Sequence, residues 1–354
     1  MDWSEPNPER QALLRQNADM TIRVGAIGAG NMGASHIRDL SFAVSGSEVS
    51  VIYDFDQARA GALAVQVGAR SVGSVEELMA ADDVDAILIA SPDDVHAEHA
   101  TLALATGKPV LCEKPLAVVE ADAKAIVEAE AASGQRRILM GFMRRFDPGY
   151  TALKAELTAA GIGEPLMIHN VHTNTSAPYG LATERTLTNM VVHEFDISRW
   201  LLDEEFASVM VLAGKPGPLT TEGERDPILV ILESASGVIV EVQAFVNSQS
   251  GYEVSCRVTG SLGQAVMGDG SFITRTKAFS RGTEVPEQWL GRFADAYRLQ
   301  LQGWIDSLLA GGTPPGASAW DGYVATIISN RAIESYRTGQ RVAIDLPSAP
   351  ALYA

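Results

Sequence analysis

From residue 21 to about residue 145, short apolar runs alternate with longer segments whose apolar residues recur at helical spacing. Strands of a parallel sheet are covered on both faces and are almost continuously apolar, whereas the helices between them are apolar on one face. The apolar runs predict strands at residues 22–27, 49–53, 85–90, 109–112 and 138–142. The intervening segments predict helices at residues 32–40, 56–67, 75–80, 96–105 and 119–132. This alternation indicates an α/β domain with a doubly wound parallel sheet.

After residue 145 the pattern changes, because strand-like runs with alternating apolar and polar residues are separated by turn glycines. These runs predict strands at residues 208–212, 228–234, 238–246, 253–259 and 264–267. Helices are predicted at residues 150–160, within 186–202, and at 293–309 and 319–338. Alternating strands are typical of a sheet with one covered face. We therefore expect a second α/β domain with an open, mainly antiparallel sheet.

Composition and charge exclude several classes of partner. The formal net charge of −17 argues against nucleic acid and anionic membranes, which bind basic surfaces. No apolar run approaches the roughly 18 residues that span a bilayer, and residues 1–20 form a polar tail without the apolar centre of a signal peptide. The two cysteines are too few for a disulfide framework or a cysteine-based zinc site. We expect a cytoplasmic protein that binds neither nucleic acid nor membrane.

A glycine-rich loop follows the first predicted strand and opens the first helix. Gly28 permits a tight turn, Gly30 lets the backbone approach a pyrophosphate, and Gly33 allows the helix to pack closely on the strand. The helix N-terminus then faces the phosphates, and we expect Asn31 and Met32 to contact the cofactor through their backbone. A lone glycine pattern is weak evidence, but its position between a strand and a helix predicts a Rossmann dinucleotide-binding unit.

Asp54 ends the second predicted strand and bears on the choice of cofactor. A carboxylate at this position accepts hydrogen bonds from the adenosine ribose and repels a 2′-phosphate. Phe55 and Asp56 follow, so no arginine comes directly after it. The alternative is an aspartate in a surface turn. The position favours NAD over NADP.

Lys114 follows the strand predicted at residues 109–112, at the edge where doubly wound sheets bind ligands. A lysine there can donate a hydrogen bond to a substrate hydroxyl and stabilise a developing alkoxide by its charge. Pro115 restricts the backbone next to it. Taken alone, Lys114 would be more simply explained as a solvated loop residue. Its place within Glu113-Lys114-Pro115 favours a catalytic role.

Four motifs together resemble the Gfo/Idh/MocA family of oxidoreductases. They are the glycine loop, Ser91-Pro92 with His96, Glu113-Lys114-Pro115, and residues 141–145. Within this family the chain is most similar to inositol 2-dehydrogenases, at residues 141–147, 172–174, 183–184, 192–196, 251–253 and 315–323. The resemblance extends from about residue 21 to about residue 330.

The resemblance implies an NAD-binding Rossmann domain at residues 21–145 and a substrate-binding and oligomerisation domain at residues 146–354. It implies a homodimer or homotetramer formed through the open sheet. Lys114 would hold the reacting hydroxyl, and His193 would accept its proton while hydride passes to the nicotinamide. The implied cofactor contacts, besides the glycine loop and Asp54, are Ser91, Pro92, His96, Glu113 and Lys114. The implied substrate pocket contains Lys114, Arg144, His172, Asn174, Asn189, His193 and Tyr252.

Two residues of the implied site carry further arguments. A proton acceptor needs a pKa near the working pH, which an unperturbed histidine such as His193 meets. Inositol dehydrogenases usually carry an aspartate at the position of Asn189, which here keeps hydrogen bonding but cannot raise a neighbouring pKa by charge. The asparagine indicates either a changed preference among polyols and sugars or a weakened proton relay. Arg144 is expected either to contact the substrate or to brace the site.

These observations predict an NAD-dependent dehydrogenase that oxidises a ring hydroxyl of a cyclic polyol, with myo- or scyllo-inositol as the expected substrate. The alternative within the family is a dehydrogenase of a glucose-type sugar or anhydrosugar, which Asn189 motivates. A non-catalytic NAD-binding regulator would be expected to lack Lys114 or His193, and both are present. No metal is expected, because no carboxylate triad accompanies the closely spaced His96 and His99.

Overall fold

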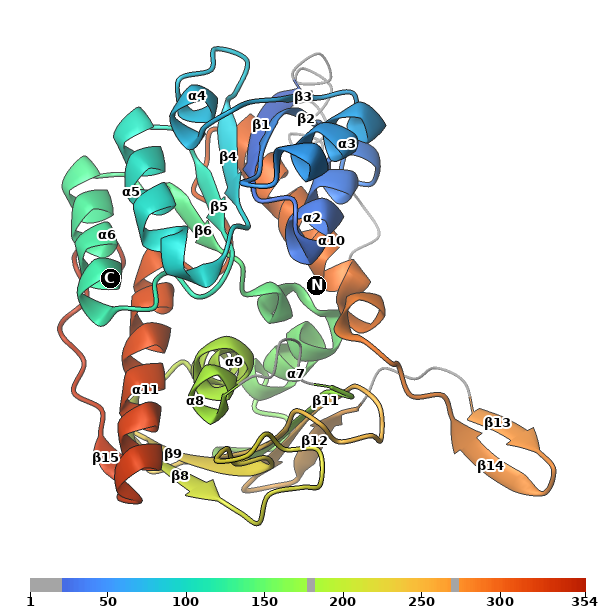
Figure 1. Ribbon diagram of the computed structural model, residues 1–354. Coiled ribbons are helices and arrows are strands. Elements are labelled where there is room, and N and C mark those ends of the chain that lie inside the picture. Colours follow the sequence, from blue (N-terminus) through green and yellow to red (C-terminus); the bar gives the residue numbers. More distant parts are fainter. Residues whose placement is uncertain (1–20, 177–181, 269–273) are drawn as a thin grey trace.

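The computed structural model describes residues 21–176, 182–268 and 274–354, and the tail expected at residues 1–20 lies outside these ranges. Figure 1 shows two sheets, one in the upper and one in the lower half of the molecule, with helices between and around them. Within the described ranges, no helix is both long and apolar enough to cross a membrane.

The first sheet is parallel throughout and has the strand order β3-β2-β1-β4-β5-β6. Its strands are β1 (Ile22–Ile27), β2 (Ser47–Tyr53), β3 (Arg70–Ser71), β4 (Ala86–Ile89), β5 (Val110–Cys112) and β6 (Ile138–Met140). The helices are α2 (Asn31–Phe42), α3 (Gln57–Val67), α4 (Val75–Met79), α5 (His96–Thr106) and α6 (Glu120–Ser133). The strand order reverses between β1 and β4, which opens a crevice at the carboxyl ends of these strands. The predicted doubly wound sheet is confirmed.

The second sheet is mixed but mainly antiparallel, with the order β12-β11-β7-β10-β9-β8-β15. Its strands are β7 (Pro165–Thr173), β8 (Phe206–Ala213), β9 (Ile228–Ser234), β10 (Ile239–Phe245), β11 (Glu253–Gly260), β12 (Gln264–Met267) and β15 (Val342–Ala343). Alternate residues of β9 and β10 are buried, as expected for a sheet covered on one face. The expected open sheet is confirmed. The sequence pattern did not reveal that β7 and β10 pair in parallel, because pairing direction depends on the path of the whole chain.

Helices cover the upper face of the second sheet in Figure 1. The segment predicted at residues 186–202 divides into a π-helical turn, η3 (Thr186–Met190), and the helix α9 (Val192–Leu202). The other helices of this half are α7 (Pro148–Thr158), α8 (Thr183–Arg185) and α11 (Ala319–Thr338). Two short 3₁₀ turns are η1 (Asp93–Val95), between β4 and α5, and η2 (Met143–Phe146), before α7. π-Helical turns frequently occur at functional sites, and this one directly precedes the helix that carries His193.

The sequence did not predict the roles of two segments in the C-terminal part of the chain. Helix α10 (Trp289–Leu309) returns to the first sheet, where Leu301, Trp304 and Ile305 complete the hydrophobic core beside α2. The hairpin of β13 (Thr274–Lys277) and β14 (Ser280–Thr283) projects away from the body in Figure 1. Its strands are exposed throughout, so no apolar periodicity marks them in the sequence.

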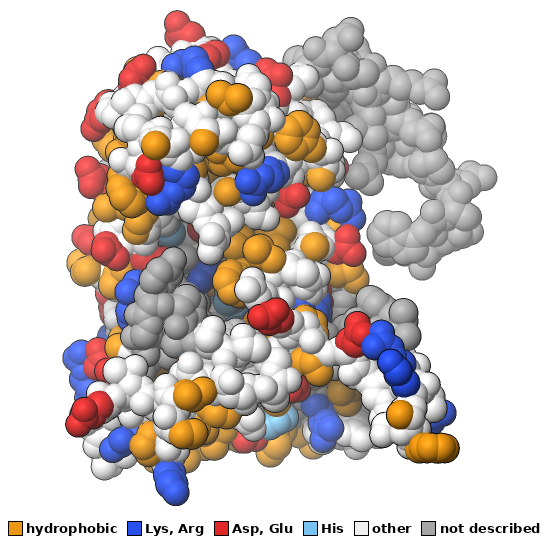
Figure 2. Space-filling model, turned by 45° about the vertical axis from the view of Figure 1, so that its right-hand side comes forward, with side chains coloured by type: hydrophobic (Ala, Val, Ile, Leu, Met, Phe, Trp, Pro, Cys, Tyr) orange, Lys and Arg blue, Asp and Glu red, His pale blue; other side chains and the backbone are white. Residues whose placement is uncertain are grey.

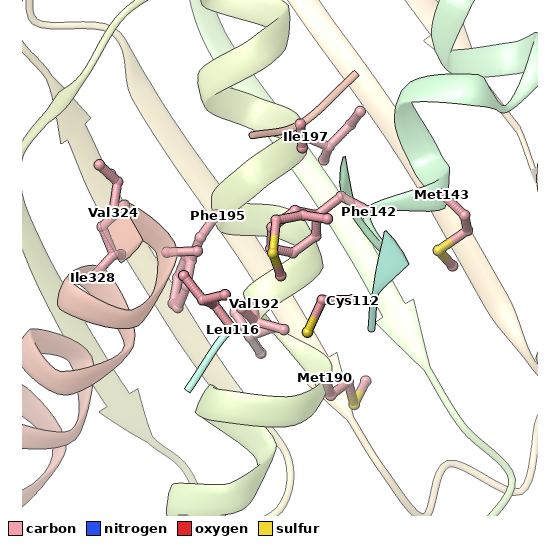
Figure 3. Packing of buried hydrophobic residues seen from close by; sticks show 14 of the residues in the cluster. Cys112, Leu116, Phe142, Met143, Met190, Val192, Phe195, Ile197, Val324 and Ile328 are labelled. Atoms are coloured by element: carbon pink, nitrogen blue, oxygen red, sulfur yellow. The ribbon is translucent and has the colours of Figure 1, made fainter. Parts of the chain in front are cut away.

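One hydrophobic cluster joins the two halves of the molecule beneath the candidate site (Figure 3). Cys112 ends β5 and Leu116 lies in the turn after it, Val192 and Phe195 come from α9, and Ile328 comes from α11. All five side chains are at most 1% exposed. Because the first four of these residues flank Lys114 or His193 in sequence, the cluster fixes the backbone that carries both side chains.

Candidate active site

The glycine loop forms an open cradle at the N-terminus of α2. A Cβ at Gly28 or Gly33 would collide with a backbone carbonyl, of Ala90 and of Gly28 respectively, and Gly28 has a φ of +100°. A Cβ at Gly30, by contrast, meets nothing within 4 Å. Gly30 is the N-cap of α2, and no side chain caps the helix there. The first amides of α2 are therefore free to bind an anion, so the cradle fits the pyrophosphate of a dinucleotide.

Asn31 and Met32, predicted to contact the cofactor through their backbone, are the first two residues of α2. Asp54 is 3% exposed and is therefore not a surface-turn residue. Its carboxylate accepts hydrogen bonds from the amides of Ala29 at 2.6 Å and Asp56 at 2.8 Å, which fixes the glycine loop. The sequence argument considered only the next two residues. In the structure, the guanidinium of Arg59 also lies near the Asp54 carboxylate, at 3.8 Å.

The segment from Ser91 to His96 leads from β4 to α5. His96 connects this segment to the turn that follows β5. Pro92 is the N-cap of η1. One ring nitrogen of His96 lies 2.8 Å from the carbonyl of Ser91, and the other lies 2.7 Å from the carbonyl of Pro115. His96 thus braces the turn that carries Lys114, and both its ring nitrogens are engaged by the backbone. Within the described part of the chain, no group of three His, Cys, Asp or Glu residues is placed to hold a metal ion.

Glu113 is buried directly before Lys114 and is held on two sides. Its carboxylate lies 2.7 Å from Nε2 of His36 on α2 and accepts the backbone amide of Lys114 at 3.2 Å. Burial alone would raise the pKa of Glu113, but the hydrogen bond and charge of His36 outweigh it, so the pKa is lowered. A Cβ at Gly141 would lie 2.8 Å from the Glu113 side chain. Glu113 therefore connects the cofactor helix with the lysine.

Lys114 reaches from the first domain into the second. Its ammonium donates hydrogen bonds to the backbone oxygen of Asn189 at 2.9 Å and to Oδ1 of Asn189 at 3.3 Å. The amide nitrogen of Asn189 donates in turn to Asp93 at 2.9 Å. Burial lowers the pKa of Lys114 and the charge of Arg144 acts in the same direction, while Glu113 and Asp93 oppose them. The structure places two predicted site residues, Lys114 and Asn189, in direct contact.

His193 lies on α9 and is 8% exposed. Its Nδ1 has no hydrogen-bond partner, and its ring packs edge-on against Phe142 at 6.3 Å between centroids. Burial lowers the pKa of His193 well below its ordinary value, and the positive charges of Arg144 and Lys114 lower it further. The expectation of an unperturbed histidine is therefore wrong. The ring is therefore uncharged at neutral pH, and its Nδ1 is buried.

A buried charge cluster stands behind His193. Arg144 pairs with Glu194, and Nδ1 of His172 lies 3.1 Å from both the Arg144 guanidinium and the Glu194 carboxylate. The ring of Tyr252 meets that of His172 edge-on at 5.8 Å. Arg144 is 1% exposed and its charge is balanced by Glu194, so it braces the site. Of the two roles expected for Arg144, the geometry favours this one.

The remaining predicted pocket residue, Asn174, follows the end of β7 and donates to the sulfur of Met190 at 3.5 Å, next to Asn189. Sequence reasoning missed Asp93 and Glu194 as parts of the site. Asp93 carried a usable signal, since it follows β4 at the same sheet edge at which Lys114 follows β5. Figure 2 shows the surface hollowed between the upper and lower domains, with hydrophobic side chains visible inside the hollow.

Comparisons with known proteins agree with this geometry. The profile of the oxidoreductase family with an NAD-binding Rossmann fold matches residues 22–142, and that of its C-terminal alpha/beta domain matches residues 154–344. The chain is 42% identical over 336 residues to inositol 2-dehydrogenase 1 of Saccharopolyspora erythraea, which covers 94% of this chain and 99% of that protein. It is 41% identical to inositol 2-dehydrogenase of Cereibacter sphaeroides, with 95% and 100% covered.

Solved structures show the same similarity. The crystal structure of myo-inositol dehydrogenase from Lactobacillus casei in complex with NAD(H) and myo-inositol matches with a TM-score of 0.91 at 34% sequence identity. The match covers 95% of this chain and 100% of that one. Both domain profiles and relatives of full length thus agree along nearly the whole sequence. With its open phosphate cradle and its lysine and histidine at the domain junction, the chain belongs to the Gfo/Idh/MocA family of oxidoreductases.

Proposed function

We propose that this protein is an NAD-dependent dehydrogenase that oxidises one ring hydroxyl of an inositol to a ketone. The observation that carries the proposal is that Lys114 of the first domain and His193 of the second lie within electrostatic reach of each other. The lysine ammonium offers a hydrogen-bond donor, and the uncharged imidazole of His193 offers a proton acceptor, next to the sheet edge that holds the phosphate cradle. Relatives named inositol 2-dehydrogenase support the substrate class.

In this proposal Lys114 and His193 divide the work on the reacting hydroxyl. Bound NAD supplies a hydride acceptor at its nicotinamide ring. Lys114 donates a hydrogen bond to the hydroxyl oxygen and stabilises negative charge as it develops there. His193, uncharged at neutral pH, accepts the hydroxyl proton. Glu113 and His96 hold the lysine turn in place, while the cluster of Arg144 and Glu194 holds the histidine helix.

A neutral, hydroxyl-rich ligand suits the lining of the site. His172, Asn174, Asn189 and Tyr252 supply donors and acceptors, and each hydroxyl left without a partner would cost about 1–3 kcal/mol. A sugar dehydrogenase is the second candidate, favoured by the neutral amide of Asn189 beside the lysine. The solved structure of the Lactobacillus casei enzyme in complex with NAD(H) and myo-inositol favours an inositol dehydrogenase.

The proposal includes the division into an NAD-binding domain at residues 21–145 and a substrate-binding and oligomerisation domain at residues 146–354. It also includes a homo-oligomer, a dimer or tetramer, in the cytoplasm. The outer face of the second sheet exposes Met167, Leu212 and Val266 by 40–57%. An open apolar sheet face is typical of an interaction surface. In the proposed oligomer, this face packs against a second copy of the chain.

The projecting hairpin supports the same assembly. Its strands carry Arg275, Lys277 and Arg281, and Phe279 is fully exposed at its tip. An isolated two-stranded hairpin is at best marginally stable in water. A basic arm with an apolar tip complements the strongly acidic surface expected from the net charge of −17. Light scattering of the intact protein tests the assembly, and a monomer at micromolar concentration would refute it.

The activity is tested by NADH formation from NAD with a panel of inositol isomers, glucose, xylose and anhydrosugars, with NADP in parallel. We expect turnover of an inositol with NAD. Lys114→Ala should lower turnover by about 10²–10³ while calorimetry shows retained NAD binding. Activity on sugars alone would assign the second candidate. Near-normal turnover of Lys114→Ala would refute the assigned chemistry, and tight NAD binding without turnover would favour a regulator.

A further inference from the structure

A hydrogen-bonded relay of three residues crosses from one domain to the other at the site. Asp93 begins the short turn η1, which follows β4, and its carboxylate accepts a hydrogen bond from the side-chain nitrogen of Asn189 at 2.9 Å. The side-chain oxygen of Asn189 in turn accepts the ammonium of Lys114 at 3.3 Å. Because an amide group has one donor and one acceptor end, the bond to Asp93 determines that the oxygen end of Asn189 faces the lysine.

We propose that Asp93 is a positioning residue of the dehydrogenase: through the amide of Asn189 it orients Lys114, and it adds a negative charge close to the ammonium. The proposal rests on the proposed function and adds a residue outside the motifs that identify the family. Without Asp93 the Asn189 amide is free to turn, and its NH₂ group would then face the ammonium. Two donors facing each other would displace the lysine from the reacting hydroxyl.

The charges around Lys114 show why Asp93 matters. Glu113, beside it on the same turn, favours the ammonium, while Arg144 from η2 disfavours it. His193 and His172 also lie within electrostatic reach of Lys114 and are held neutral by its charge, by Arg144 and by burial. Glu113 is already engaged by His36. Asp93 adds a second carboxylate, which is linked to Lys114 through Asn189. Its other charged neighbour, Arg185, lies 3.9 Å away and is 58% exposed.

Four variants separate the charge of Asp93 from its hydrogen bond. Asp93→Asn removes the charge but keeps an oxygen that can accept from Asn189, whereas Asp93→Ala removes both. Asp94→Asn is the matched control, since it makes the same change one residue away on an exposed side chain. The exchange, the double variant Asp93→Asn with Asn189→Asp, moves the carboxylate next to the lysine and keeps the hydrogen bond between the two positions, with the donor now at position 93 and the acceptor at position 189.

The first readout is independent of turnover. Competitive labelling of amines with acetic anhydride over a pH series, read by mass spectrometry of the Lys114 peptide, measures the protonation of Lys114 in the protein without substrate. We expect the labelling midpoint of Lys114 to move to lower pH in Asp93→Asn and to stay unchanged in Asp94→Asn. An unchanged midpoint in Asp93→Asn, or equal shifts in both variants, would overturn the proposal.

The second readout is the pH profile of kcat/KM with inositol. The protonated lysine is the active form, so its loss sets the alkaline limb, and removal of a favourable charge moves this limb to lower pH in Asp93→Asn. Asn189→Asp alone places two carboxylates within 3 Å of each other, which disfavours both being ionised. We therefore expect the exchange to be more active than Asn189→Asp by about tenfold.

An exchange no better than Asn189→Asp alone would overturn the orienting role. If the wild-type protein oxidised no polyol at all, the proposed function would fail, while the labelling series would still decide whether Asp93 controls Lys114. Circular dichroism and NAD binding of each variant show that it is folded. Asp93→Asn keeps the size of the side chain and an oxygen that can accept a hydrogen bond. It therefore still tests the proposal if Asp93→Ala does not fold.

Discussion

Glu194→Gln tests whether a buried ion pair stabilises the centre of this protein. The Glu194 carboxylate is completely buried and contacts both Arg144 and His172. Burial would raise the pKa of Glu194, but Arg144 and His172 outweigh it and the pKa is lowered. Glutamine has nearly the same shape without the charge, so the substitution leaves the Arg144 cation buried and without its counterion.

The size of the effect follows from that burial. Removing one partner of a buried ion pair costs about 3–5 kcal/mol, because the remaining charge keeps its desolvation penalty. With a urea dependence of roughly 3 kcal/mol per molar, the unfolding midpoint of Glu194→Gln should fall by about 1 M or more. An exposed pair is worth about 1 kcal/mol at most, so the control Asp83→Asn, which removes the charge of the exposed ion pair with Arg70, should shift the midpoint far less.

Urea unfolding followed by tryptophan fluorescence measures both midpoints, since the chain has five tryptophans. The pH dependence gives a second check on the sign. A carboxylate with a lowered folded pKa stabilises the protein fully above its ordinary value of 4.5, and the contribution is lost as the pH falls through the folded pKa. The gap between wild type and Glu194→Gln should therefore narrow in acid. A midpoint of Glu194→Gln equal to that of Asp83→Asn at neutral pH would refute the reasoning.

Three further predictions concern the cofactor and the base. Gly30→Ala should weaken NAD binding in calorimetry by about tenfold or more, or 1.4 kcal/mol, without lowering Tm, whereas Gly33→Ala should lower Tm because its Cβ meets a backbone carbonyl; equal Tm losses would contradict this. Because the pKa of His193 is lowered, the acidic limb of kcat/KM should lie below pH 6.5, and a limb above that value would exclude His193 as the base. Asp54→Ala should reduce the preference for NAD over NADP by about tenfold, and an unchanged ratio would remove Asp54 from the selection of the cofactor.

The sequence by itself determined the doubly wound sheet and the phosphate cradle. Both depend on rules that act over a few neighbouring residues. The strand β4 is buried throughout, so its apolar run is continuous, and two positions of the glycine loop, Gly28 and Gly33, have no room for a Cβ. Lys114 and His193 were recognised because short motifs surround them and resemble those of a known family.

Only the tertiary structure decided the electrostatics of the site. Asp93 and Asn189 are 96 residues apart, and Arg144 and Glu194 are 50 apart, so no local pattern relates them. The lowered pKa of His193 also escaped prediction, because burial and the charges around a residue come from segments that meet only in the folded chain. Local sequence therefore placed the chemical groups in their elements, and long-range packing set their charge, orientation and partners.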